Sequence, residues 1–305
     1  MEILRIEQLH KKYGKNEVIK GLELQVPEGE IFGFIGQNGA GKTTTMKMIL
    51  GLLPADSGSI FVCGQQVTFG ETKTNEVIGY LPDVPEFYPY MTAMEYLKLC
   101  GKVTGMTEGK TKERSTELLS LVGLPVSKKK IGGYSRGMKQ RLGIAQALLN
   151  QPKLLICDEP TSALDPVGRK EILDILLAVK GQTTVLFSTH ILSDVERICD
   201  RVAVLHDGKI QLSGTLQELK SQHKAETLVL EFLNAEICNH FAASMAKNMP
   251  EHQCDCKETE CVIHTDHLEE TQRQVMENLL KEEILPIRME ALEPSIESLF
   301  LGVVS

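Results

Sequence analysis

The chain has 305 residues, 42% of them hydrophobic and 24% charged, which is the composition of an ordinary soluble globular protein with room for one main domain and a smaller one. Its net charge of −8 disfavours a broad nucleic-acid-binding surface, and we expect no nucleic-acid partner. No apolar run approaches the roughly 20 residues of a membrane-spanning helix, and the first residues lack the pattern of a secretory signal, so we expect a cytoplasmic protein.

The eight cysteines agree with a reducing compartment. In a chain of this length they are typical of small hydrophobic side chains rather than of a disulfide framework. Three of them, Cys63, Cys157 and Cys199, fall in segments that we expect to be buried strands or helices.

The first 50 residues predict two strands followed by a strand, a loop and a helix. Apolar patterning indicates strands over 3–9 and 18–26, and the apolar run IFGFIG then leads into a glycine-rich loop. Beyond the loop, TTTMKMILGLL carries apolar residues at helical spacing. This order is the structural context that a phosphate-binding loop requires.

The loop itself, GQNGAGKTT, fits the P-loop pattern of proteins that bind nucleoside triphosphates. Its glycines let several backbone N–H groups point at one phosphate chain, and the next helix adds its positive N-terminal end. We expect Lys42 to neutralise the β- and γ-phosphates, Thr43 to place its hydroxyl on Mg²⁺, and Thr44 to reach an inner phosphate. The residues expected to bind the nucleoside triphosphate in this loop are Gly36, Gln37, Asn38, Gly39, Ala40, Gly41, Lys42, Thr43 and Thr44.

Residues 86 to about 150 predict a helical insertion. Thr92 precedes AMEYLKLC as a helix start, and the Gly132-Gly133 pair is a stop signal. Ser135 is a good N-cap for a helix from Arg136 to Leu149, and the N-terminus of that helix favours a bound anion.

From residue 153 onward, strand and helix patterns alternate, which predicts a parallel sheet and an α/β fold. The expected elements are the strand KLLIC, a helix from Pro166 to Val179, the strand TTVLFS, a helix from Leu192 to Cys199, and the hairpin RVAVLHDGKIQLSG.

Two acids, Asp158 and Glu159, follow the apolar strand LLIC. This position places both carboxylates at the carboxyl edge of the sheet, where ligands bind. We expect Asp158 to hold Mg²⁺ through water and Glu159 to polarise the attacking water as a general base. Taken alone, an acid pair at a strand end is also common in solvated turns.

The segment YSRGMKQRL at 134–142, together with the acid pair, resembles the signature motif of ABC ATPases. The resemblance covers about residues 1–220 and implies a P-loop nucleotide-binding domain with a helical subdomain, using ATP and Mg²⁺. It also implies that two such domains sit head to tail, as a homodimer or heterodimer. Ser135 and the backbone of Gly137 would then meet the γ-phosphate held by the P-loop of the second nucleotide-binding subunit.

The same resemblance assigns roles outside these motifs. It implies that Tyr13 stacks on adenine, that residues 162–165 contact the opposite subunit, and that His190 contacts the γ-phosphate. Lys42, Glu159 and His190 are then the catalytic residues.

Three positions depart from the commonest ABC pattern. Asp83 stands where a glutamine usually senses Mg²⁺ and the water, Arg136 replaces a signature glycine, and Met138 replaces its glutamine. Asp83 is either a ligand of Mg²⁺ or of a water, or a turn residue after Pro82.

Residues 221–305 predict a second, small α+β domain. The expected strands are 226–233, 251–256, 260–265 and 284–291, and the expected helices are 235–247 and 267–281. This order resembles a split βαβ unit, and PSIESLFLGV predicts a final short helix.

The same domain contains six residues of types that bind zinc or copper in proteins. Their spacing fits no common zinc motif, so we expect no metal there. These residues are His252, Cys254, Cys256, Cys261, His264 and His267.

The overall pattern, including YLPD, YSRGMKQRL and EPSIESLF, is similar to the motor subunits of bacterial exporters of antibiotics, lipids or sodium. That similarity implies an ATPase that energises export by a separate transmembrane permease and sits on the inner face of the cell membrane through it. Two alternatives remain. A soluble ABC ATPase acting on a protein or nucleic-acid machine is disfavoured by the single P-loop, and a sensor that binds ATP without turnover is disfavoured by Glu159.

Overall fold

The computed structural model describes residues 2–222, 226–249, 252, 254–265 and 267–292. The chain divides into two units, Met1–Leu216 and Gln217–Ser305, and each is described by itself. The final helix predicted over PSIESLFLGV lies outside the described residues.

The first unit is built on a central sheet of six strands. All neighbouring strands run parallel except β10 and β9, which form the predicted hairpin. The residues of β3 and β7 are all buried, which explains their uninterrupted apolar sequences. The α/β fold with a parallel sheet is therefore confirmed. The spatial order is β10 (Lys209–Thr215), β9 (Arg201–His206), β3 (Ile31–Ile35), β8 (Thr184–Thr189), β7 (Leu154–Asp158) and β6 (Ile78–Leu81).

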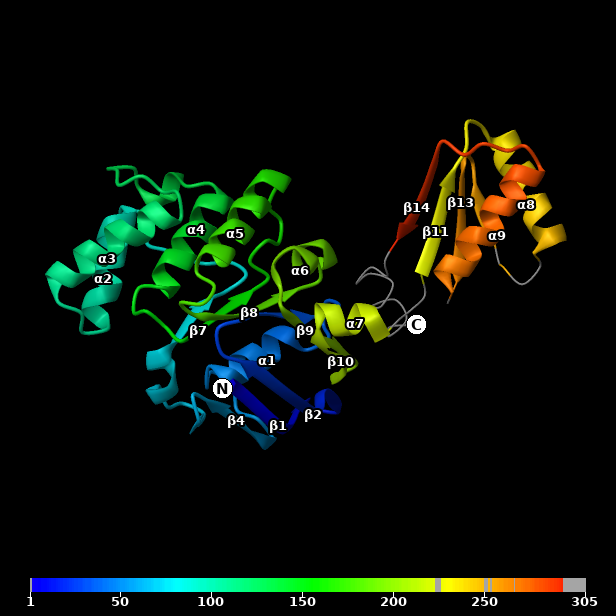
Figure 1. Ribbon diagram of the computed structural model, residues 1–305. Helices are drawn as coiled ribbons and strands as arrows, with labels where there is room; N and C mark the ends of the chain where they lie inside the picture. The colour runs from blue at the N-terminus through cyan, green and yellow to red at the C-terminus, as the bar shows by residue number, and fades with distance from the viewer. Residues whose placement is uncertain (1, 223–225, 250–251, 253, 266, 293–305) are drawn as a thin grey trace. The chain divides into compact units, whose positions relative to one another are not determined.

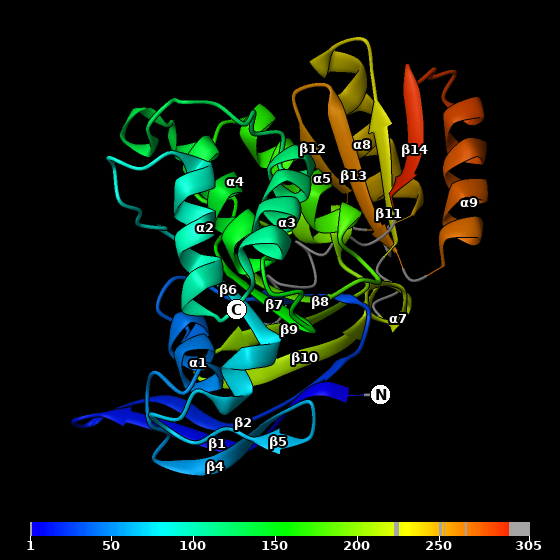
Figure 2. The same cartoon turned by 90° about the vertical axis from the view of Figure 1, so that its left-hand side faces the viewer.

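A second, antiparallel sheet lies beside the first in the same unit (Figures 1 and 2). Two of its strands are longer than the sequence predicts, and the other two were not predicted. The order is β2 (Asn16–Pro27), β1 (Glu2–Tyr13), β4 (Ser57–Val62) and β5 (Gln65–Gln66).

Helix α1 (Lys42–Ile49) lies between the two sheets, as Figure 1 shows. Its residues Met46 and Ile49 belong to one buried core with Leu4 of β1 and Phe32 of β3. Because α1 is packed on both sides, the loop that precedes it is attached to a rigid element.

The opposite face of the central sheet carries helix α4 (Arg136–Ala147). A Cβ at Gly79 of β6 would lie 2.2 Å from the carbonyl oxygen of Ala147, and one at Gly143 would lie 2.5 Å from Leu81 Cδ1. Two glycines therefore permit the close approach of α4 to the edge strand. The other helices of this region are α2 (Ala93–Val103), α3 (Glu108–Leu121), α5 (Pro166–Ala178) and α6 (Leu192–Ile198), with short 3₁₀ helices η1 (Lys73–Val77) and η2 (Ile131–Gly133).

Thr92 begins α2 with a reciprocal capping box, as expected of this residue. The Glu95 N–H donates to Thr92 Oγ1 at 3.2 Å, and the Thr92 N–H donates to Glu95 Oε2 at 2.7 Å. The second of these bonds is the main cause that lowers the pKa of Glu95 to about 2.

Several predicted details were wrong. Cys63 lies half-buried in the turn after β4, not in a buried strand, because the strand ends one residue earlier at Val62. Helix α4 ends at Ala147, not Leu149. Helix α7 (Leu216–Gln222) and strand β6 were not predicted.

From Glu226 onward, the described residues of the second unit form a four-stranded antiparallel sheet with two helices. Phe241 of α8 and Val275 of α9 share a buried core with Leu228 and Leu230, which lie on one face of β11, so both helices cover that face. Strand β13 separates β11 from β12, which is the order of a split βαβ unit. The elements are β11 (Glu226–Glu231), α8 (Ala235–Asn248), β12 (Cys254–Lys257), β13 (Glu260–Thr265), α9 (Leu268–Lys281) and β14 (Arg288–Leu292).

Candidate nucleotide-binding site

Three neighbouring strands end at the same edge of the central sheet. In the register of β3, β8 and β7, Ile35 pairs with Thr189, and Ser188 pairs with Asp158. The residues that directly follow these strands are therefore brought together: Gly36 after β3, His190 after β8 and Glu159 after β7.

The backbone of the loop between β3 and α1 favours glycine at three of its positions. Gly41 has φ +111°, and a Cβ there would lie 2.5 Å from Ile19 Cδ1. A Cβ at Gly36 would lie 2.7 Å from the carbonyl oxygen of Leu205. At Gly39, which has φ +83°, a Cβ would meet nothing within 4 Å, so this part of the loop is open.

Helix α1 begins at Lys42, and no side chain among the described residues caps its first N–H groups. The first N–H groups of a helix have no partner within the helix, and they favour an anion. The Thr43 side chain is exposed and that of Thr44 is half-buried at this end. A curled loop, free N–H groups and hydroxyls therefore fit a phosphate chain.

The ammonium group of Lys42 is buried inside the loop. Lys42 Nζ donates to the carbonyl oxygen of Gly36 at 2.6 Å and to that of Gln37 at 3.2 Å. It also pairs with Glu159 Oε1 at 3.1 Å. The predicted phosphate-binding lysine and the predicted general base are thus direct neighbours.

Both acids at the end of β7 are held by the adjacent strand β8; Asp158 is the last residue of β7, and Glu159 follows it. Ser188 Oγ donates to Asp158 Oδ1 at 2.7 Å, and the Glu159 N–H donates to Ser188 Oγ at 3.0 Å. Asp158 is 2% exposed, and Glu159 adopts φ +48°, which turns the chain directly after the strand. One hydroxyl therefore holds both the Asp158 carboxylate and the backbone of Glu159.

Glu159 also contacts the third predicted catalytic residue. His190 Nδ1 lies 2.9 Å from Glu159 Oε2. The Glu159 carboxylate therefore lies between Lys42 on one oxygen and His190 on the other.

Sequence reasoning missed Ser188. The signal was present, because Ser188 and Thr189 are polar residues at the end of an otherwise apolar strand. It also missed Asp194 of α6, which is buried, accepts a hydrogen bond from Thr161 Oγ1 at 2.7 Å and pairs with Arg169 at 2.7 Å. These bonds anchor the chain that leads from the acid pair to α5.

The signature segment lies on the other side of the central sheet. Ser135 caps α4, with its hydroxyl accepting from the Met138 N–H at 3.2 Å, as the sequence predicts. Ser135 is exposed, and Gly137 is half-buried. Helix α4 packs on the face of β6 that carries Leu81. Tyr80, on the other face of β6, packs with the core around α1. Ser135 and Lys42 therefore lie at the starts of helices on opposite faces of the central sheet.

The remaining predicted residues lie at the surface. Asp83 follows β6 and pairs with Arg136 at 3.5 Å, so two of the departures from the ABC pattern contact each other. Tyr13 ends β1 and is 51% exposed, with Lys11 Nζ 5.8 Å from its ring centroid. Residues 162–165 precede α5, which Asp165 caps by accepting from the Gly168 N–H at 2.9 Å.

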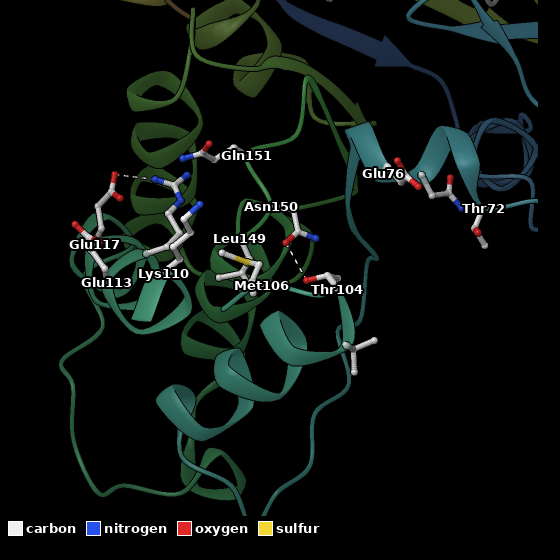
Figure 3. A pocket seen from close by; sticks show the side chains of 13 residues that line it. Thr72, Glu76, Thr104, Met106, Lys110, Glu113, Glu117, Leu149, Asn150 and Gln151 are labelled. Carbon is white, nitrogen blue, oxygen red and sulfur yellow. Dashed lines mark hydrogen bonds and ion pairs between the residues drawn. The ribbon is translucent and has the colours of Figure 1, made fainter. Parts of the chain in front are cut away.

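A hollow of about 1090 Å³ lies elsewhere in the first unit, and Figure 3 shows it from close by. Its walls come from η1, from the ends of α2 and α3, and from the segment after α4. Thr104 Oγ1 donates to Asn150 Oδ1 at 3.0 Å across it. Neither Lys42 nor Glu159 lines this hollow, so it is distinct from the nucleotide site. In the part of the chain that the structure describes, no helix is long and apolar enough to cross a membrane.

Solved structures share this fold. A structure described as an ATP-binding subunit of an ABC transporter is 33% identical, with a TM-score of 0.66, and the match covers 72% of this chain and 92% of that one. A dimeric ATP-binding cassette in a post-hydrolysis state, bound to ADP and phosphate, is 25% identical, with a TM-score of 0.63 over 70% and 98% of the two chains.

Relatives by sequence agree with the structures. Residues 19–162 match the family model described as ABC transporter. The uncharacterized ABC transporter ATP-binding protein YxlF of Bacillus subtilis (strain 168) is 47% identical over 229 residues, which are 75% of this chain and 76% of that protein. The linearmycin resistance ATP-binding protein LnrL of the same organism is 34% identical over 305 residues, covering 99% and 98%. With its P-loop, acid pair and signature segment on this fold, the chain belongs to the ATP-binding proteins of the ABC transporter family.

Proposed function

We propose that this chain hydrolyses ATP with Mg²⁺ and uses the reaction to energise export by a separate transmembrane permease. The observation that carries the proposal is the row of residues at the ends of β3, β7 and β8, where Glu159 lies between Lys42 and His190. A phosphate-binding cation and a general base within hydrogen-bonding reach of each other are what phosphoryl transfer to water requires.

The residues of the loop take the substrate's phosphates. Backbone N–H groups at the start of α1 and the Lys42 ammonium bind the phosphate oxygens. Mg²⁺, which prefers oxygen ligands, fits the hydroxyl of Thr43 and the carboxylate of Asp158, and its charge would offset that of the phosphates. Asp83 remains a proposed additional ligand at this site, and Tyr13 a proposed adenine contact.

Glu159 is the proposed general base of the chemical step. Its carboxylate accepts a proton from the attacking water, while His190 orients the carboxylate and contacts the γ-phosphate. The ion pair between Lys42 and Glu159 has to open as phosphate oxygens take over the lysine, and this frees the carboxylate for the water. The binding of ATP would thus prepare the base.

A second nucleotide-binding subunit completes the site in this proposal. Ser135 and Gly137 lie at the start of α4, on the face of the sheet opposite α1, so their N–H groups are available to a phosphate held by another chain. The dimeric state of a solved relative supports this arrangement.

Two substitutions separate the structural role of Ser135 from its proposed role in catalysis. Ser135→Ala removes the N-cap and should lower the free energy of unfolding by about 1 kcal/mol. Ser135→Asp keeps an acceptor for the Met138 N–H, so urea denaturation should show near wild-type stability. It also places a negative charge where the γ-phosphate would bind, and ATP turnover should be lost.

Wild-type turnover in a stably folded Ser135→Asp protein would rule out this assignment. Ser127→Asp is the matched control, because Ser127 is exposed in the loop before the signature segment and lies outside any helix. It adds the same charge and should change neither stability nor turnover.

The partner is proposed to be a polytopic membrane protein, which leaves this chain at the inner face of the cell membrane. Support comes from LnrL, which is named as a resistance protein and matches this chain over nearly its whole length. Affinity purification of the tagged chain from detergent-solubilised membranes should recover such a protein in stoichiometric amount. Recovery of a stable complex with soluble proteins alone would favour the alternative, an ABC ATPase acting on a soluble machine.

A further inference from the structure

Four of the eight cysteines lie in the second unit, and the sheet register brings three of them together. Cys256 of β12 pairs directly with Cys261 of β13. Cys254 lies two residues before Cys256, so it points to the same face of the sheet. Strand β12 lies at an edge of this sheet, and its two cysteines are half-buried.

The three thiols are close enough to share a ligand. Their sulfur atoms all lie within 4.8 Å of one another, and Cys254 Sγ is 2.7 Å from Cys261 Sγ. All three are free thiols; Cys261 is fully buried, while Cys254 and Cys256 are half-buried. Thiolates bound to one zinc ion at about 2.3 Å each lie about 3.8 Å apart, so Cys254 Sγ and Cys261 Sγ would move apart by about 1 Å on binding the ion.

A fourth thiol approaches from helix α8. Cys238 is fully buried in the core that also contains Cys261, and Cys256 packs against that core. The neighbours on α8 are apolar, with Phe241 and Met245 in the same core. In this part of the core, the sulfur atoms are therefore the groups that could bind a metal ion.

We propose that this cluster binds a thiophilic metal ion, Zn²⁺ or Cu⁺, through Cys254, Cys256 and Cys261. Sulfur donors select these ions, whereas Mg²⁺ and Ca²⁺ require oxygen. Three sulfurs suffice for Cu⁺, whereas Zn²⁺ takes a fourth ligand to complete its tetrahedron. A bound ion would tie the edge strand β12 to β13.

The site is independent of the ATPase reaction, so its test does not depend on turnover. Full-length protein is purified with a phosphine reductant, depleted of metal, and titrated separately with Zn²⁺, with Co²⁺ as a spectroscopic probe, and with Cu⁺ supplied from a competing chelator. We expect one ion per chain. Thiolate-to-cobalt charge-transfer bands with tetrahedral visible bands would show that the thiols bind a divalent ion, and retention of Cu⁺ without these bands would show a site selective for Cu⁺.

Three variants make the result specific. Cys254→Ser and Cys256→Ser remove half-buried ligands and should each weaken binding by at least about 100-fold, since even residues that only support metal ligands contribute 10- to 100-fold. Cys63→Ser, which removes a half-buried thiol from the first unit, should bind like wild type. Any of three results would overturn the proposal. In the first, the wild-type protein retains neither ion in the titrations, and in the second, the Cys254 and Cys256 variants retain the ion as well as wild type does. The third result is a Cys254–Cys261 disulfide that persists in the reductant.

Discussion

Replacing Glu159 by glutamine is expected to lower the rate of ATP hydrolysis by about 10²- to 10⁴-fold, the usual contribution of a general base. Glutamine keeps the size of the side chain and an oxygen for Lys42, which lies 3.1 Å from the carboxylate in the structure. It cannot accept the proton of the attacking water. It also removes a negative charge beside the phosphates, so ATP affinity should stay the same or rise.

The measurement is phosphate release at saturating ATP and Mg²⁺, together with size-exclusion chromatography. The Glu159→Gln protein should accumulate as an ATP-bound dimer, because ATP closes the pair and is not consumed. Glu171→Gln is the matched control, since Glu171 is an exposed acid on α5, and it should hydrolyse ATP like wild type. Unchanged turnover in Glu159→Gln would remove Glu159 from the role of base.

Replacing Lys42 by alanine is expected to weaken ATP binding by about 10- to 100-fold, because a hydrogen bond to a charged group contributes about 1.5–3 kcal/mol. The Lys42 ammonium is buried and is held by the carbonyl oxygens of Gly36 and Gln37, so it is already aimed into the loop. Without it, the loop keeps its N–H groups but loses its only cation. Hydrolysis should fall below detection.

Titration with a fluorescent ATP analogue measures the binding, and thermal unfolding without nucleotide shows whether the fold is kept. Lys47→Ala is the control from the same helix, because Lys47 is exposed in the last turn of α1. It should bind the analogue as wild type does. Equal affinities in the Lys42 and Lys47 variants would contradict the assignment of the phosphate site.

The sequence predicts the local parts of the nucleotide site but not their contacts. The P-loop, the acid pair and the cap at Ser135 are each set by a short run of residues, and local backbone preferences act on runs of that length. The ion pair between Lys42 and Glu159 joins residues that are far apart in the chain, and it depends on β3 and β7 lying on either side of β8. The order of strands in a sheet is a tertiary property, so the role of Ser188 was missed as well.

The cysteine cluster of the second unit also depends on contacts between strands, which the sequence does not predict. The spacing of the cysteines along the chain argued against a metal. The register between β12 and β13 then placed Cys261 directly opposite Cys256. Zinc motifs are recognised by the spacing of their ligands along the chain. That spacing does not reveal a cluster that a hairpin brings together from two paired strands.

The central claim is that the unit of function is a pair of chains, with Lys42 of one and Ser135 of the other at one ATP. Lys42→Ala and Ser135→Asp proteins should each be inactive alone. In a mixture, half of the sites in each mixed dimer combine an intact Lys42 with an intact Ser135. The measurement is the rate of ATP hydrolysis after mixing the two inactive proteins: activity that appears on mixing is the predicted result, and a mixture as inactive as its components would contradict the account.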